Sequence, residues 1–269
     1  MFTPAEFVDN YANIGAGKAK APALKLFLLA VLAGFYIAMG GAVTNVASHA
    51  VANVSLAKLI NSLIFPFGLI MVIITGAELF TGNCLITISV LEKKATIAGM
   101  ARNLVLVYLG NFVGGLLVAM GGIYCGQLNM SGGDLAVTTM KIAATKCTLS
   151  FGPAFVMGIL CNILVCAGVV CSLCGKDLPG RAIGAFVPVC FFILGGFEHC
   201  VANMYYIPAG ILAAANPQYV EQALSVGVNV SALTWGNFFL TNLVPVTLGN
   251  IVGGAGLGAL LWAAHKKIK

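Results

Sequence analysis

The sequence predicts an all-α membrane protein with six transmembrane helices, arranged as two inverted three-helix repeats in which helices 2 and 5 are broken. Three observations lead to this fold class. The 269 residues are 60% hydrophobic and only 8% charged, whereas a soluble domain carries about 25% charged residues. Six apolar stretches are long enough to cross a bilayer. One segment from the middle of the chain occurs again near its end with almost the same sequence, which indicates an internal repeat.

The apolar stretches place the individual spans. A short apolar piece, 84–91, follows the second stretch too closely to cross alone. The fifth stretch is interrupted by Gly195-Gly196-Phe197-Glu198-His199, so the second and fifth helices are both expected to break within the membrane. The six predicted spans are 24–47, 57–77, 99–125, 151–174, 183–213 and 235–264.

Lys and Arg are distributed unevenly between the two ends of these spans. Eleven of the 14 lie at one set of ends, and only Lys58, Lys141 and Lys146 lie at the other. Because basic residues stay on the cytoplasmic side, both termini are expected in the cytoplasm, beneath a bacterial inner membrane. The basic residues form no patch with aromatic residues, which excludes a nucleic-acid partner.

Residues 1–23 form a separate N-terminal segment. Thr3-Pro4-Ala5-Glu6 is a capping box that begins a helix, with Pro in its first turn. Phe7, Tyr11 and Ile14 follow at helical spacing and predict an amphipathic helix on the cytoplasmic surface. The pattern leaves open whether this helix gates the protein or only leads into the first span.

A 13-residue segment occurs twice in the chain. Residues 103–115 and 242–254 are identical at ten of 13 positions, including two Asn residues and a final Gly pair. The copies lie in the third and sixth spans, so they cross the bilayer in opposite directions, as inverted-topology repeats do. The channel domain, 24–264, is therefore expected to consist of two inverted halves, 24–125 and 151–264.

The two breaks correspond to each other under this inversion. Non-helical backbone at membrane depth is tolerated only where it is buried in protein or lines a cavity, so the breaks indicate the permeation path. The half-helices that begin near Gly82 and Cys200 are expected to aim free backbone N–H groups at the bilayer centre, which favours an anion. Glu78 and Glu198 are expected to accept hydrogen bonds from loop N–H groups. A role as transport carboxylates is the alternative.

His199 is the only histidine inside a span. An imidazole at such a break can donate to a passing anion or exchange a proton with a weak acid, and Thr81 in the other break is the expected partner that fixes its ring. The sequence shows no spacing typical of metal ligands and no pair of nucleophile and base. We therefore expect no enzyme activity, no metal and no cofactor.

The residues at the breaks and in the last span resemble the formate/nitrite transporter family across essentially the whole chain. Within this family, the stretch Thr81-Gly82-Asn83-Cys84 is most similar to the clostridial hydrosulfide ion channel branch. The resemblance implies an aquaporin-like protomer that has its own pore, lies in membrane lipid and assembles as a homopentamer. The matching segments are Glu78-Leu79-Phe80-Thr81, Gly196-Phe197-Glu198-His199, Ala202-Asn203-Met204 and Pro245-Val246-Thr247-Leu248-Gly249-Asn250.

The resemblance also implies roles for particular residues. His199 becomes the central histidine between two hydrophobic constrictions, and Thr81 becomes the threonine of the loop. Lys146 draws anions into the outer vestibule. The other implied positions are the cytoplasmic constriction at Leu69, Leu79 and Phe80, the outer constriction at Phe65, Val165 and Phe192, and polar pore-lining residues at Asn162 and Asn250.

Together these features predict a membrane channel for the small monovalent weak-acid anions hydrosulfide, formate and nitrite, with hydrosulfide favoured. A hydrophobic constriction resists hydrated ions, and such an anion can cross as a neutral species after it takes a proton near His199. A proton-coupled formate or nitrite symporter is the first alternative, because a sequence cannot separate it from a channel. A neutral-solute channel of the aquaporin type is the second, although the paired Asn-Pro-Ala motifs of that class are absent from the sequence.

Overall fold

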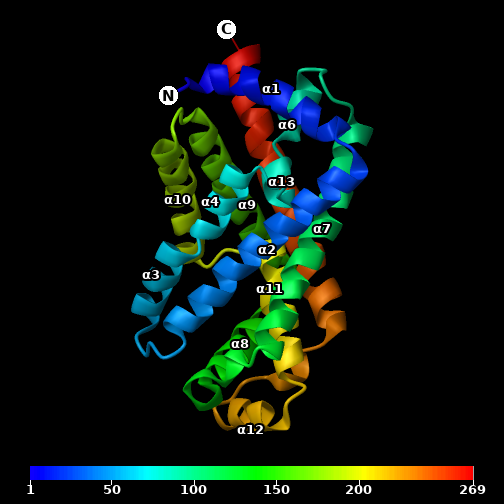
Figure 1. Ribbon diagram of the computed structural model, residues 1–269. Coiled ribbons are helices and arrows are strands. Elements are labelled where there is room, and N and C mark those ends of the chain that lie inside the picture. The colour runs from blue at the N-terminus through cyan, green and yellow to red at the C-terminus, as the bar shows by residue number, and fades with distance from the viewer. Residues whose placement is uncertain (269) are drawn as a thin grey trace.

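The computed structural model describes residues 1–268, and in them six helical segments are long and apolar enough to cross a membrane. The predicted fold class is confirmed. Figure 1 shows both chain ends at the same end of the bundle, as an even number of crossings requires. In chain order the helices are α1 (Pro4–Lys20), α2 (Ala23–Ser48), α3 (Val54–Ile64), α4 (Phe67–Thr75), α5 (Phe80–Asn83), α6 (Ile86–Leu91), α7 (Ile97–Tyr124), η1 (Gln127–Gly133), α8 (Asp134–Cys147), α9 (Phe151–Cys174), α10 (Leu178–Gly195), α11 (Cys200–Ala213), α12 (Pro217–Ser225), η2 (Val230–Ala232), η3 (Asn237–Leu243), α13 (Val244–Trp262) and η4 (Ala263–Lys267).

The duplicated segment forms the tightest helix contacts in each half. It lies in α7 and α13, which pack along α2 and α9 respectively. A Cβ atom at Gly114 would lie 2.1 Å from the carbonyl oxygen of Val31, and one at Gly253 would lie 2.3 Å from that of Ile159. No side chain fits at either position, so glycine allows the two helix backbones to touch, as it does in membrane helix pairs.

The second and fifth spans are broken as predicted, but both begin earlier than their apolar stretches. The second span consists of α3 and α4, and it starts at Val54 because Asn53 Oδ1 accepts a hydrogen bond from Leu56 N at 3.0 Å. The fifth starts with α10, where Asp177 caps the helix through Gly180 N. Such polar caps fix a helix start ahead of its first apolar run.

The end of the bundle opposite α1 contains two helices in segments where no helix is predicted. Figure 1 shows α8 and α12 at this end, and α8 packs against α11. The last span also differs from the regular helix that was predicted, because it begins as the π-helix η3 and continues as α13. Pro245 has no backbone N–H and its ring excludes the carbonyl one turn earlier, which accounts for the wider turn.

The N-terminal helix α1 begins with the predicted capping box. Glu6 N donates to Thr3 Oγ1 at 3.3 Å, and Thr3 N donates to Glu6 Oε2 at 2.7 Å. Phe7 and Tyr11 are buried in a cluster with residues of α6 and α9, whereas Ile14 is 42% exposed and borders a cavity. The apolar face of α1 therefore covers protein.

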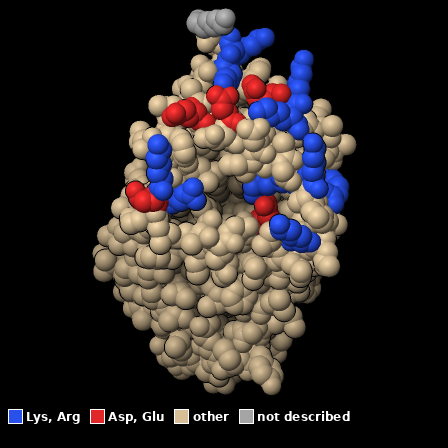
Figure 2. Space-filling model, turned by 45° about the horizontal axis from the view of Figure 1, so that its top comes forward, with Lys and Arg blue, Asp and Glu red and all other residues tan. Residues whose placement is uncertain are grey.

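Charged side chains gather at the end that carries α1. Figure 2 brings this end forward and shows Lys and Arg around a hollow, while the flank below it is uncharged. Large apolar side chains such as Leu109 and Leu117 on α7 and Val252 on α13 are at least half exposed. An uncharged, apolar flank of this kind suits contact with lipid or with another copy of the chain.

Candidate permeation pathway

The two broken helices have the same backbone geometry at their breaks. α4 and α10 end at Gly76 and Gly196, whose φ angles are 69° and 70°. Glycine enters this left-handed region without strain. Three residues later, Leu79 and His199 are extended and occupy the N-cap positions of α5 and α11. The inversion inferred from the repeat therefore extends to the breaks themselves.

The carboxylate in each break forms a partly buried ion pair. Lys18 Nζ donates to Glu78 Oε2 at 2.7 Å, and Lys146 Nζ donates to Glu198 Oε1 at 2.6 Å. The prediction of loop N–H donors is wrong, since side chains donate to both carboxylates in the described part of the chain. A carboxylate removed from water is stabilised more by a full positive charge than by peptide dipoles.

Asparagine amides complete a polar cluster around each ion pair. Asn83 Nδ2 donates to Glu78 Oε2 and Asn203 Nδ2 to Glu198 Oε2, both at 2.7 Å. The sequence analysis missed these residues, although Asn follows Glu by five positions in both breaks and the repeat begins with Asn in both copies. The Lys18 cluster consists of Lys18, Glu78, Asn83 and Asn103, and the Lys146 cluster consists of Lys146, Glu198, Asn203 and Asn242.

The second asparagine of each repeat copy holds a break in shape. Asn111 Oδ1 accepts from Phe80 N, and Asn250 Oδ1 accepts from Cys200 N, both at 2.9 Å. Their Nδ2 atoms donate to the carbonyls of Glu78 and Glu198. The first N–H group of each half-helix is therefore occupied, and for this group the prediction of a free N–H is wrong.

Two of the implied pore-lining residues lie behind the passage. Asn162 and Asn250 are both 0% exposed. Asn162 Nδ2 donates to the carbonyl oxygens of Asn250, at 2.6 Å, and of Thr81, at 3.2 Å. Both amides therefore support the backbone around the passage.

His199 and Thr81 meet across the two breaks. Thr81 Oγ1 lies 2.8 Å from His199 Nε2, and the other ring nitrogen, Nδ1, accepts from Ala202 N at 3.0 Å. Because Nδ1 accepts, the ring proton of the neutral imidazole is on Nε2 and points to the threonine oxygen. The hydrogen of the Thr81 hydroxyl is then free to donate elsewhere.

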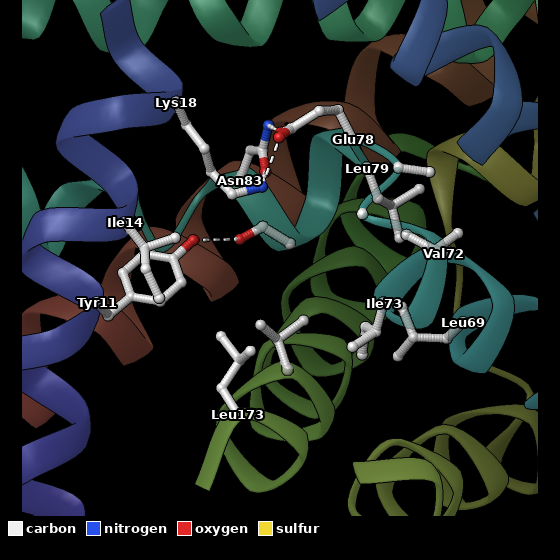
Figure 3. A pocket seen from close by; sticks show the side chains of 14 residues that line it. Tyr11, Ile14, Lys18, Leu69, Val72, Ile73, Glu78, Leu79, Asn83 and Leu173 are labelled. Atoms are coloured by element: carbon white, nitrogen blue, oxygen red, sulfur yellow. Dashed lines mark hydrogen bonds and ion pairs between the residues drawn. The ribbon is translucent and has the colours of Figure 1, made fainter. Parts of the chain in front are cut away.

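Three cavities follow one another through the protein, and His199 borders two of them. The α1-side vestibule has a volume of about 300 Å³ and includes Lys18, Glu78 and Asn83 in its lining, as Figure 3 shows. A central cavity of about 10 Å³ follows, which is space for about one water molecule. The α8-side vestibule has a volume of about 190 Å³. Leu69 and Leu79 border the first two cavities, and Phe192 and His199 border the last two.

Both implied constrictions surround the one central cavity. Its lining contains five of the six residues implied as constrictions, together with His199. The exception is Phe80, whose ring packs on Tyr108 with 4.9 Å between centroids and borders an apolar groove beside α7. Lys146 borders the α8-side vestibule as implied, but it is paired with Glu198. The five lining residues are Phe65, Leu69, Leu79, Val165 and Phe192.

The sequence and the fold were compared with known proteins. A family model described as "Formate/nitrite transporter" matches residues 5–264. The chain is 39% identical to "Formate channel FocA" of Haemophilus influenzae, over 94% of this chain and 90% of that one. It is 37% identical to "Probable formate transporter" of Methanothermobacter thermautotrophicus, over 98% and 97%. The solved structure "Pentameric formate channel with formate bound" matches with a TM-score of 0.82 at 34% identity, over 92% of this chain and 98% of that one.

Proposed function

The chain belongs to the formate/nitrite transporter family, and from that premise we propose that it is a channel for small monovalent weak-acid anions. It is a multi-pass membrane protein whose relatives are channels and transporters rather than enzymes. Formate is the anion named for those relatives, and we propose that it passes this chain as well. Hydrosulfide, favoured from the sequence, and nitrite share its small size and single charge and stay predictions.

The hydrogen bond between His199 and Thr81 carries this proposal, because it leaves the hydroxyl hydrogen of Thr81 free beside His199, the polar residue that lines an otherwise apolar narrowing. An anion in such a passage loses most of its hydration, which is costly. A single donor does not replace that hydration for chloride. A formate ion takes a proton from a hydronium ion in the vestibule, so that one O–H bond of that ion breaks, an O–H bond of formic acid forms and water is left behind. Formic acid then crosses and gives the proton to water beyond the narrowing.

In this mechanism the proton passes together with the solute, as it also does in the symport alternative. Ala202 N–H occupies Nδ1 of His199, so the imidazole cannot take a second proton there without breaking this bond. The proton that neutralises the anion is then drawn from the vestibule and moves with it. A current-free flux that acidifies the receiving compartment identifies this mode, whereas a flux that carries current identifies a channel for the anion.

We further propose that five copies assemble and that the α1 end faces the cytoplasm of a bacterial cell, beneath its inner membrane. The first point is supported by the structural match to a pentameric relative. The second is supported by the excess of Lys and Arg at the α1 end, since basic residues are retained on the cytoplasmic side.

The test is solute flux into liposomes that contain the purified protein, with His199→Asn as the variant. Asparagine keeps an N-cap acceptor for Ala202 N–H but removes Nε2. We expect wild-type protein to pass formate and exclude chloride, and His199→Asn to change formate flux roughly tenfold, the size of one hydrogen bond. His49→Asn serves as the control. The His49 ring forms hydrogen bonds with Val46 O and Ser131 Oγ outside the passage.

Two results contradict the proposal. Wild-type protein that passes glycerol but not formate is a neutral-solute channel. If His199→Asn has the same flux, selectivity and pH response as wild-type protein, the imidazole takes no part in the mechanism.

A further inference from the structure

An apolar groove of about 620 Å³ lies between α7 and α13, and it shares no lining residue with the three cavities of the passage. Its volume is within the range of about 300–1,000 Å³ that is typical of sites for small organic ligands. Tyr108 and Thr247 are the polar side chains of its lining, and their hydroxyl oxygens bond to each other at 2.9 Å. The groove therefore offers hydrocarbon contacts to an occupant and no unpaired hydroxyl.

The groove lies where the two inverted halves meet. In the 13-residue repeat, Val105 corresponds to Val244 and Leu109 to Leu248, and all four side chains line the groove. The two copies cross the membrane in opposite directions, so a site built from equivalent positions of both copies is centred in the bilayer. At this depth the surrounding solvent is the acyl chains of lipid.

The two mouths of the groove differ in charge. Arg102 directly precedes the first repeat copy, and Thr241 occupies the equivalent position before the second. Arg102 lies on the same face of α7 as Val105 and Leu109, because residues three and seven positions apart share a helix face. Neither α7 nor α13 contains Asp or Glu. An occupant of the groove therefore meets a cation at the α1-side mouth.

The Arg102 guanidinium is available to an anion. The side chain is exposed, and one of its five N–H groups donates to Ala21 O at 3.0 Å. Arg102 forms no ion pair within residues 1–268, and the exposed Lys20 and Lys25 flank Ala21 in the chain. A guanidinium binds phosphate through two parallel hydrogen bonds. At a membrane surface, such a phosphate is supplied by a lipid headgroup.

We propose that the groove and Arg102 form a binding site for one anionic phospholipid, with its phosphate at Arg102 and an acyl chain along α7 as far as the Phe80 ring. The α7 lining runs from Ala101 to Leu109, about 12 Å at 1.5 Å per residue. This is most of the depth of one leaflet, about 15 Å. Phe80 borders the groove, and its neighbour Leu79 lines the central cavity. A bound chain therefore supports the wall of the passage from the membrane side.

The test is thermal unfolding of the detergent-solubilised protein with added palmitoyl-oleoyl phosphatidylglycerol or phosphatidylcholine, and it needs no transported solute. The two lipids have the same chains, but only phosphatidylglycerol has a net negative charge. A ligand that binds only the folded protein raises the melting temperature. We expect phosphatidylglycerol to raise it by roughly 3 °C more than phosphatidylcholine does. Glycerol phosphate, which lacks acyl chains, should leave it unchanged.

Arg102→Gln tests the headgroup contact and should remove the difference between the two lipids. Arg181→Gln is the matched control and should keep the difference. Arg181 is also exposed at the α1 end and donates to a carbonyl oxygen, that of Gly175, at 3.2 Å, but it lies on α10 and does not border the groove. Equal losses in the two variants indicate unspecific attraction to basic residues and overturn the site.

Val105→Trp tests the acyl-chain contact, because its indole fills the groove, and it should also remove the difference. Val156→Trp on α9 is the control and should keep the difference, since Val156 lies outside the groove and is 51% exposed, against 59% for Val105. If Val105→Trp does not fold, Leu109→Trp, about one turn further along the groove, takes its place.

Four further results overturn the site. Wild-type protein that responds equally to both lipids has no preference for an anionic headgroup. A full shift with glycerol phosphate shows that no chain is bound, and a lipid difference that persists in Val105→Trp shows that the chain does not lie in the groove. If Val105→Trp dissociates the oligomer in light scattering and Val156→Trp does not, a second copy of the chain fills the groove instead of lipid.

Discussion

Residue by residue, the inverted halves agree at supporting positions and differ at positions that face the solute. Lysine, glutamate and asparagine recur in both polar clusters with matching contacts. Counted from the glutamate of each break, His199 corresponds to Leu79, and Thr81 corresponds to Val201. The symmetry therefore fails at the two residues whose hydrogen bond lies beside the central cavity, which His199 lines. A property shared by both halves stabilises the fold, and one present in a single half is a candidate for function.

The Thr81 hydroxyl can be removed with almost no change in shape by Thr81→Val. His199 Nε2–H then loses its acceptor, and a buried donor left unpaired lowers the free energy of unfolding by about 1–3 kcal/mol. Formate flux should fall as well, because the narrowing loses its donor. Thermal unfolding in detergent and liposome flux measure the two effects.

Thr139→Val on α8 is the matched control. Thr139 is also buried, but its hydroxyl donates to Leu135 O of its own helix. Loss of this hydroxyl therefore leaves no buried donor without an acceptor and does not change the passage. Equal losses of stability and flux in the two variants contradict the assigned role of Thr81.

At the scale of helices, the sequence predicted elements whose signal is local and missed contacts that join distant elements. Apolar length fixed the spans, and the glycines and charges at 76–78 and 195–199 located both breaks. The lysines that pair with Glu78 and Glu198 come from α1 and α8, 60 and 52 positions away in the chain. No local pattern reports which lysine reaches a buried carboxylate, so backbone donors were predicted instead. Phe80 was misplaced because the resemblance assigns it to the constriction by its motif, and a motif does not show which way a residue at a helix start points.

Helix α13 offers a direct test of the close glycine contact. In Gly253→Ala the new Cβ meets Ile159 O at 2.3 Å, and such overpacking lowers the free energy of unfolding by about 1–3 kcal/mol or more. Gly256 lies on the same helix with no atom within 4 Å of a Cβ, so Gly256→Ala should be neutral or stabilising by up to about 1 kcal/mol. Thermal unfolding of the two variants should therefore shift in opposite directions, and a shared shift argues against the α9–α13 contact.

The start of α1 should respond to pH. Hydrogen bonds from the backbone N–H and the hydroxyl of Thr3 hold the pKa of Glu6 below its ordinary value of 4.5. A lowered pKa means that this contribution to helix stability is present above the unfolded pKa and is lost as the pH falls through the folded one. The protection of first-turn amides against hydrogen exchange, taken relative to the intrinsic rate at each pH, should therefore fall as the pH drops below the ordinary pKa of glutamate. In Glu6→Gln, which keeps an acceptor but does not titrate, the exchange should lack this step.

On the scale of the whole molecule, the two inverted halves enclose a single passage with unlike ends. The α1 end carries the termini and most of the basic side chains. The α8 end carries a vestibule whose lining includes Lys58, which forms no ion pair within residues 1–268. Because the inverted repeat alone gives no direction, orientation in the membrane follows from the charge distribution and needs its own measurement.

Native cysteines make that measurement possible. Cys125 is exposed at the end of α7 that lies toward α8, and Cys171 is exposed near the end of α9 that lies toward α1. With Cys171→Ser, Cys125 should react with a membrane-impermeant thiol reagent added to intact cells, because the α8 end is proposed to face outward. In the background Cys125→Ser with Cys171→Ser, Lys267→Cys at the α1 end should react only after the cells are opened. The reverse pattern inverts the proposed orientation and makes the α8-side vestibule the cytoplasmic mouth.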